Sequence, residues 1–306
     1  MSRGEVRAML QTRSAFAVST HPAHARVRHI VLDPAALRAF FADVATIDVQ
    51  ELEYVPFMRF VIGTRLDAAL GGDFGRAIRA IVADRASGGF TVGVGDATSS
   101  DADFVRFGTA VAHLVGPANY DAMSKTFYAR FTVEHTDTSD SYLRQAYRDM
   151  KLHTDGTFVD DATDWLLMMK FAERNARGGE SRLLHLDDWS ECDRFANAPM
   201  ASVALTYKSP PSKNVAQMVK RPTFFERDGH PCLSFIDQFA YPDSPAQATY
   251  LYELSQSLES AATAMPLPVG DLVTLNNLFW AHGRAAFEPD VDLYRELMRQ
   301  RGVFSK

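Results

Sequence analysis

Residues 153–158 read HTDGTF, and a second stretch at 270–284 reads GDLVTLNNLFWAHGR. Side chains of a β-strand alternate between its two faces, so a His-x-Asp pair on a strand places the imidazole of His153 and the carboxylate of Asp155 on one side. The second stretch supplies a distal histidine, His282, at the end of an apolar segment. Two histidines and one carboxylate form the ligand set that suits Fe(II) and leaves positions open for other ligands. These stretches predict a metal site in a β-rich fold.

The His-x-Asp pattern occurs three times in the chain, so spacing alone does not select the metal pair. The pair at 135–137 runs into a polar turn, which predicts local hydrogen bonds between side chains and backbone. The pair at 185–187 lies where a strand is expected to give way to a helix, and there Asp187 or Asp188 suits an N-cap. The pair at 153–155 lies at the exit of a β-like run. We therefore predict that this pair binds the metal together with the distal histidine.

The composition indicates a globular protein with a sizeable core. Of the 306 residues, 46% are hydrophobic and 23% are charged. The formal net charge of −6 argues against nucleic acid as the main partner, because phosphate binding needs a basic face, but a small anionic substrate needs only a local cationic pocket. Two cysteines without CxxC spacing argue against a disulfide framework and favour a cytoplasmic protein. No apolar run approaches the ~20 residues of a membrane span.

The pattern along the chain predicts one domain, mainly β with flanking helices. Helical spacing or capping residues predict helices at 34–45, 73–84, 101–115 and 246–263. Apolar and β-branched runs predict strands at 57–62, 126–134, 163–171, 202–207, 231–236 and 271–280, with a hairpin from the last run to the distal histidine. Many short strands with polar turns indicate a jelly roll. The expected organisation is a disordered tail at 1–29 and a domain at 30–306, divided into a mixed α/β part at 30–125 and a jelly-roll core at 126–306.

The chain also resembles a known enzyme family, the taurine dioxygenase and γ-butyrobetaine hydroxylase type of 2-oxoglutarate oxygenase. The similarity lies in four segments of matching order and approximate spacing: HTDGTF at 153–158, GGES at 178–181, NNLFWAHGR at 276–284 and RELMRQRG at 295–302. Within this type, residues 140–158 and 209–215 further resemble the carbon-starvation-induced branch, whose members hydroxylate glutarate. The resemblance covers roughly residues 30–306.

The resemblance implies a double-stranded β-helix of the clavaminate synthase-like kind, with Fe(II) as the metal. It implies homotetramers that convert glutarate to L-2-hydroxyglutarate while 2-oxoglutarate and O2 become succinate and CO2. It also implies that Arg295, 13 residues after His282, and Ser181 bind the C5 carboxylate of 2-oxoglutarate. The fork of an arginine side chain matches a carboxylate well.

Arg295, Arg299 and Arg301 have even spacing, so a continuous strand would place them on one face. Converging cations repel one another unless anions bind between them. Because 2-oxoglutarate and glutarate are both five-carbon dicarboxylates, we assign Arg299 to 2-oxoglutarate and Arg301 to the substrate. The spacing leaves open which carboxylate each of these arginines holds.

Further candidates for substrate binding precede the metal pair in the sequence: Lys125, Tyr128 and Arg130. Other functions remain open. The same chemistry could act on a taurine-like or betaine-like acid, or Zn(II) in the same ligands could support a hydrolase or isomerase. A binding protein that has lost its metal is a third alternative. Zinc gives no use to the arginine and serine set, and the intact ligands argue against loss of the metal.

Overall fold

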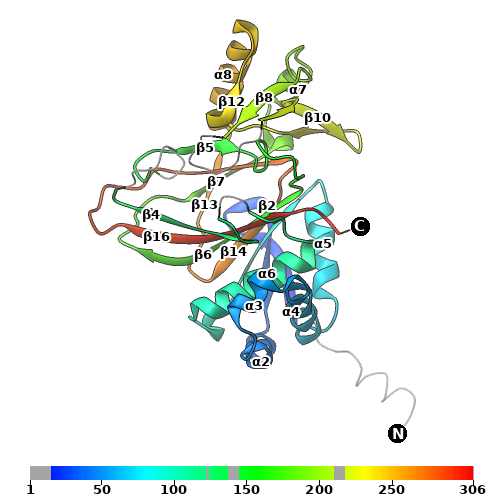
Figure 1. Ribbon diagram of the computed structural model, residues 1–306, viewed down its shortest axis with the longest axis vertical. Coiled ribbons are helices and arrows are strands. Elements are labelled where there is room, and N and C mark those ends of the chain that lie inside the picture. Colours follow the sequence, from blue (N-terminus) through cyan, green and yellow to red (C-terminus); the bar gives the residue numbers. More distant parts are fainter. Residues whose placement is uncertain (1–14, 122–123, 137–144, 210–217, 306) are drawn as a thin grey trace.

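Two facing β-sheets form the centre of the computed structural model, which describes residues 15–121, 124–136, 145–209 and 218–305 (Figure 1). The larger sheet has seven strands, in the order β1 (Phe16–His21), β2 (His24–Leu32), β3 (Gly89–Gly93), β14 (Asp271–Asn276), β6 (Trp165–Arg174), β16 (Tyr294–Gly302) and β4 (Ala129–Glu134). The smaller sheet has the order β13 (Thr263–Met265), β7 (Ser181–His185), β15 (Trp280–Arg284) and β5 (Met150–His153). Neighbouring strands are antiparallel, except that β2 and β3 are parallel.

The central strand β6 separates two hydrophobic cores. Its first seven residues, WLLMMKF, are all buried, as expected for a strand that is covered on both faces. Leu167 and Met169 belong to the core beneath the helices, while Leu166 and Met168 belong to the core between the sheets. This alternation follows from the two-residue period of a strand.

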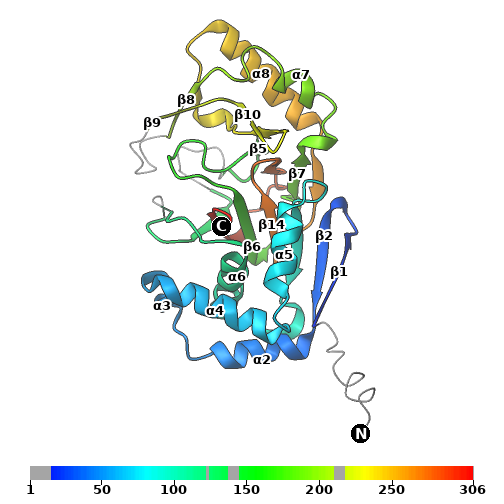
Figure 2. The ribbon, with the colours of Figure 1, turned by 90° about the vertical axis from the view of Figure 1, so that its right-hand side faces the viewer.

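Helices cover the outer face of the larger sheet (Figure 2). They are α2 (Pro34–Val44), α3 (Val49–Tyr54), α4 (Pro56–Ala69), α5 (Phe74–Ala83) and α6 (Asp101–Val115). The side chain of Asp33 caps α2 by accepting hydrogen bonds from the backbone of Ala35 and Ala36 at 2.8 and 3.0 Å. Helix α6 lies directly on β6 and β16 and is buried along most of its length.

Beyond the smaller sheet lies a second group of helices and strands (Figure 1). It contains α7 (Cys192–Ala196), α8 (Pro245–Ser260), the hairpin of β10 (Phe224–Arg227) and β11 (His230–Leu233), and a sheet of β12 (Ala240–Tyr241), β8 (Leu205–Lys208) and β9 (Met218–Arg221). Trp189 stacks on Phe195 with ring centroids 5.2 Å apart, and α8 packs against β5. These elements therefore support the strand that carries the first metal-binding candidate.

Most of the expected elements are present, but three expectations are wrong. Residues 57–62 lie in helix α4, because Pro56 is preorganised for its first turn and Ile62 and Leu66 face the core at helical spacing. Residues 16–32 form the strands β1 and β2 instead of a tail, since Val27 and Ile30 are buried and β2 pairs with β3. Residues 1–14 lie outside the described part of the chain.

The third wrong expectation concerns the hairpin that ends at His282. Strand β14 pairs with β3 and β6 in the larger sheet, whereas β15 pairs with β7 and β5 in the smaller sheet. The Asn276-Asn277 pair is therefore a corner between the two sheets.

Among the described helices, none combines the length and the apolar character that crossing a bilayer requires.

At Gly116 the backbone at the end of α6 lies very close to the backbone that follows β16. Gly116 ends α6, and a Cβ atom at this position would lie 2.0 Å from the backbone oxygen of Val303. We expect Gly116→Ala to destabilise the fold by about 1–3 kcal/mol, as overpacking does in other cores. Urea unfolding monitored by circular dichroism measures this change. Thr249→Ala on the exposed face of α8 is the control, and equal stability of the two variants would contradict the prediction.

Candidate metal centre

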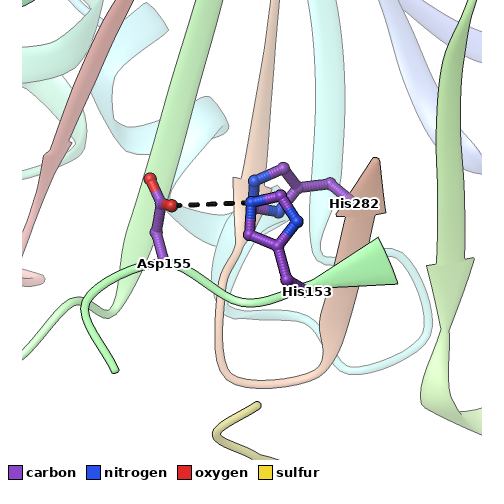
Figure 3. A group of neighbouring side chains, drawn as sticks. All are labelled: His153, Asp155 and His282. Carbon is purple, nitrogen blue, oxygen red and sulfur yellow. Dashed lines mark ion pairs between the residues drawn. The ribbon is translucent and has the colours of Figure 1, made fainter. Parts of the chain in front are cut away.

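The three predicted ligands converge between the two sheets (Figure 3). His153 ends β5 and pairs directly with His282 in β15, with ring centroids 4.3 Å apart. Asp155 follows just beyond β5, with Oδ1 3.9 Å from Nε2 of His153. One ligand atom from each residue lies within 4.8 Å of the other two. This spacing allows all three atoms to bind one metal ion.

Hydrogen bonding orients the His153 ring toward this point. Its Nδ1 lies 2.8 Å from the backbone oxygen of Lys151 and donates a proton to it. A proton on Nδ1 leaves the lone pair of a neutral imidazole on Nε2. Metal-binding histidines commonly use this arrangement, in which a carbonyl fixes the tautomer and the ring orientation.

The electrostatics keep two of the ligands, His282 and Asp155, in their metal-binding protonation states. Burial, followed by the nearby His153, lowers the pKa of His282 to about 3, so this imidazole is neutral near pH 7. Burial alone would raise the pKa of Asp155, but Arg299 and the neighbouring histidines outweigh it and hold the pKa well below its ordinary value. Neutral imidazole and ionised carboxylate are the forms that bind a metal.

Two arginines lie on the Asp155 side of a pocket that the three ligands line. Arg299 and Arg301 extend into this pocket from β16. Nη1 of Arg299 is 3.1 Å from Oδ2 of Asp155, and its Nη2 donates to Oδ2 of Asp121 at 2.8 Å. Arg301 approaches the same Asp121 oxygen at 4.0 Å. Asp121, which the sequence did not single out, therefore balances part of the arginine charge.

A second pair of buried arginines lies near Ser181. Arg284 lines the pocket and is opposite Ser181 across β15 and β7. Arg295 donates a hydrogen bond to the backbone oxygen of Gly179. Among the described residues, no carboxylate lies within ion-pair distance of either guanidinium. Burial, followed by repulsion from Arg295, lowers the pKa of Arg284 to about 10. Two buried cations without a carboxylate indicate a place for an anion.

Arg284 was missed in the sequence, although a signal was present. It lies two residues after His282, so the period of a strand places both side chains on the same face. Its guanidinium donates to the backbone oxygens of Gln145, Ala146 and Ala285. These bonds hold the group in place while leaving its charge without an ion-pair partner in the described structure.

The three further substrate candidates do not line the pocket. Tyr128 donates to Oε1 of Glu53 at 2.8 Å, and Arg130 pairs with Asp101 and Glu296. Lys125 is exposed. From this part of the chain the pocket is instead lined by Phe131, Thr132 and Val133. The spacing of Tyr128 and Arg130 gave no sign of their own partners, which come from other segments of the chain.

Neither of the other His-x-Asp pairs contributes to a metal group among the described residues. Nδ1 of the exposed His135 contacts the hydroxyl of Tyr147 at 2.7 Å, and Asp137 lies outside the described residues. The expectation of an aspartate N-cap at 187 or 188 is wrong. His185 caps the short turn by accepting from the backbone of Asp187 at 3.0 Å, and both aspartates instead pair with arginines.

This architecture and side-chain group define the class: a double-stranded β-helix protein with a group of two histidines and one carboxylate that could hold a metal ion. The family model described as CsiD matches residues 16–304, and the chain belongs to this family. The resemblance found in the sequence and the jelly-roll prediction are thereby confirmed.

Curated relatives cover most of the chain. Glutarate 2-hydroxylase of Citrobacter koseri is 46% identical over 272 residues, covering 87% of this chain and 83% of the relative. The protein of the same name from Pseudomonas putida is 47% identical with the same coverage. Glutarate 2-hydroxylase of Salmonella typhimurium strain LT2 is 42% identical over 303 residues, covering 97% and 93%.

Solved structures show the same fold at low identity. The non-heme iron oxygenase OrfP in complex with Fe and alpha-ketoglutaric acid has a TM-score of 0.70 at 14% identity, covering 90% of this chain and 94% of that one. Asparagine oxygenase has a TM-score of 0.68 at 14% identity, covering 90% and 93%. At these identities the likeness concerns the architecture only.

The metal assignment leads to a direct test. Alanine at His153, Asp155 or His282 should each abolish turnover and Fe(II) retention, because each removes one ligand of three. His135→Ala and His185→Ala serve as controls and should keep the metal. Iron content after anaerobic reconstitution, and succinate release, measure both effects. Loss of iron in His185→Ala with retention in His153→Ala would show that the metal has been assigned to the wrong His-x-Asp pair.

Proposed function

We propose that this protein is an Fe(II)- and 2-oxoglutarate-dependent oxygenase that hydroxylates glutarate at C2. The product is L-2-hydroxyglutarate, and 2-oxoglutarate and O2 become succinate and CO2. The observation that carries this proposal is the pair of arginine groups on two sides of the candidate metal ligands. The names of the curated relatives support glutarate as the substrate.

The charges near the metal ligands suit two dicarboxylates. Arg284, Arg295, Arg299 and Arg301 supply four positive charges and a divalent metal would supply two, while Asp121 and Asp155 remove two. The remaining excess equals the charge of two dicarboxylate ions. Lys170 and Glu173 neutralise each other at 2.6 Å and do not alter this balance. A buried excess of positive charge is costly unless anions bind.

The donor set fits divalent iron, since two imidazoles and one carboxylate leave half of an octahedral shell open. When bound, iron supplies the oxygen chemistry that hydroxylates the substrate at the expense of 2-oxoglutarate. His153, Asp155 and His282 would hold the metal on one side. Phe158 and Phe239, whose ring centroids are 4.7 Å apart, line the pocket and help to exclude water.

The residues divide between the two dicarboxylates by position. Arg295 and Ser181, with Arg284 beside them, would bind the C5 carboxylate of 2-oxoglutarate. Arg301 would bind a carboxylate of the substrate. From the sequence we assign Arg299 to 2-oxoglutarate, but its contact with Asp155 and the partner Asp121 that it shares with Arg301 favour a role beside Arg301. Arg299 would then bind the substrate and also hold the Asp155 carboxylate in place through its Oδ2 atom.

Assembly and location extend the proposal. The family resemblance supports a homotetramer, which light scattering should detect as four times the chain mass of 34.0 kDa. The two cysteines, which are free and buried, support a reducing compartment such as the cytoplasm.

Glutarate hydroxylation itself is tested with anaerobically reconstituted enzyme. We expect glutarate, 2-oxoglutarate and O2 to give succinate and a product heavier than glutarate by one oxygen, detected by mass spectrometry. Strong turnover of taurine or a betaine, with none of glutarate, would replace the substrate and leave the oxygenase assignment standing.

The co-substrate site gives a second prediction. Arg295→Ala should weaken 2-oxoglutarate binding by about 2–5 kcal/mol, because it leaves a buried carboxylate unpaired. Ser181→Ala should cost about 1 kcal/mol, the typical contribution of one hydrogen bond. Anaerobic titration of the Fe(II) enzyme with 2-oxoglutarate measures both values. An unchanged affinity in Arg295→Ala would move the co-substrate carboxylate elsewhere.

Chain length gives a third prediction. We expect glutarate to stimulate succinate formation from 2-oxoglutarate, and the dicarboxylates succinate and adipate to do so poorly, because a fixed carboxylate anchor determines which carbon faces the metal. A misplacement of about 1 Å costs on the order of 100-fold in rate. Arg301→Ala should uncouple the reaction, so that 2-oxoglutarate is consumed with little hydroxylated product.

Arg130→Ala is the matched control for Arg301→Ala. Arg130 is also an arginine of the larger sheet, but it pairs with Asp101 and Glu296 away from the pocket. Its replacement should leave the ratio of hydroxylated product to succinate unchanged. Equal stimulation by dicarboxylates of all lengths, or equal uncoupling in both variants, would contradict the assignment of the anchor.

A further inference from the structure

The backbone of Asp155 lies beyond the last residue of β5, where hydrogen bonding to the neighbouring strand ends. A side chain from a distant segment takes over. Oδ1 of Asn277 accepts from the backbone N–H of Asp155 at 2.8 Å, and its Nδ2 donates to the backbone oxygen of the same residue at 3.0 Å. The same Nδ2 donates to the backbone oxygen of Thr163 at 2.8 Å. One amide therefore binds both backbone groups of a metal ligand.

This arrangement requires an amide. A side-chain amide offers an acceptor and two donors on one short, planar group. All three partners of Asn277 are backbone groups, so their own chemistry decides which end of the amide is oxygen. Asn277 is buried, with 4% of its surface exposed, so water does not compete for these bonds. An aspartate would lack the donors, and an aliphatic residue would lack every bond.

The same amide closes the loop that contains Asp155. This loop connects β5 to β6, and Asn277 binds it at Asp155 near its start and at Thr163 near its end. The backbone N–H of Asn277 also donates to Asp164 at 2.9 Å. Inside the loop, Gly156 has a φ of +79°, and a Cβ atom there would lie 2.2 Å from Oγ1 of Thr163. The loop is therefore drawn together at its base, beside the metal ligand.

Asn277 also lies on the chain that carries the third ligand. It is part of the corner between β14 and β15, and His282 follows five residues later. From the other side, Thr154 donates its N–H to Phe235 at 2.8 Å and accepts from Phe235 N–H at 3.0 Å through Oγ1. The backbone between His153 and Asp155 is thus held by two segments remote in sequence.

We propose that Asn277 is a positioning residue that sets the metal affinity of the centre by fixing the backbone of Asp155. This inference rests on the metal-ligand assignment made under the proposed function. Replacing residues that orient metal ligands typically lowers metal affinity or activity 10- to 100-fold. The hydrogen bonds that the Asn277 side chain makes to Asp155 and Thr163 all go to backbone groups, so its effect acts through the position of the Asp155 backbone.

Asn276 offers a matched control. It belongs to the same corner and is equally buried, with 3% of its surface exposed. Its Nδ2 donates to Val82 at 3.0 Å, and its Oδ1 accepts from Leu278 N–H at 3.1 Å. Replacing either asparagine by alanine therefore removes a buried amide from one corner. Only the replacement of Asn277 removes bonds to a metal ligand.

The experiment titrates metal-free protein with Co(II), a spectroscopically visible stand-in for Fe(II), and records thermal unfolding of each metal-free variant. We expect Asn277→Ala to weaken Co(II) binding by about 10-fold or more, and Asn276→Ala by less than about 3-fold at a similar loss of thermal stability. Equal weakening in both variants would mean a general effect of the corner and overturn the proposal, as would an unchanged affinity in Asn277→Ala.

Asn277→Asp provides a second variant that preserves the shape of the side chain. It keeps the acceptor for Asp155 N–H, loses the two donors and adds a negative charge near the cation. Charge alone would tighten Co(II) binding, whereas displacement of Asp155 would weaken it. Tighter binding therefore overturns the proposal. His153→Ala tests the metal-ligand assignment separately from the role of Asn277. If this variant still binds Co(II) as the unaltered protein does, the metal-ligand assignment is wrong.

Discussion

The direct pairing of His153 with His282 across β5 and β15 is the constraint on which the site depends. These residues are 129 positions apart in the sequence, and the pairing brings their rings to 4.3 Å. A shift of one residue in the register would turn one imidazole to the opposite face of the sheet. Because β5 is an edge strand, its free side needs other support. Glu259 of α8 provides it by accepting from the backbone of Leu152 at 2.6 Å.

The second constraint is the charge buried around this pairing. Arg299 lies between the carboxylates of Asp155 and Asp121, so its charge is balanced within the protein. Arg284 and Arg295 have no such partner among the described residues, and the backbone oxygens that hold them cannot neutralise them. A buried pair repays its desolvation only with good geometry and complete hydrogen bonding. The structure thus separates Arg299, whose charge is balanced within the protein, from Arg284 and Arg295, whose charges suit an external anion.

The sequence predicted features that local signals determine. Asp33 and Pro34 mark the start of α2, and the two-residue period placed His153 and Asp155 together. Features that depend on distant partners were missed. Tyr128 and Arg130 were expected in the pocket, but they bind Glu53, Asp101 and Glu296, which no local pattern indicated. Asp121 gave no local signal, since its importance comes from Arg299, which lies far along the chain.

The corner at Asn276-Asn277 shows why the pattern of one segment could not settle the topology. A hairpin would have kept β15 beside β14 in the larger sheet and separated His282 from His153. Crossing to the other sheet places β14 in one wall of the barrel and β15 in the other. A chain that leaves a sheet gives up regular backbone pairing, and buried backbone groups must find other partners. Short amide side chains can bind both kinds of backbone group, which explains why two asparagines occur where the chain crosses.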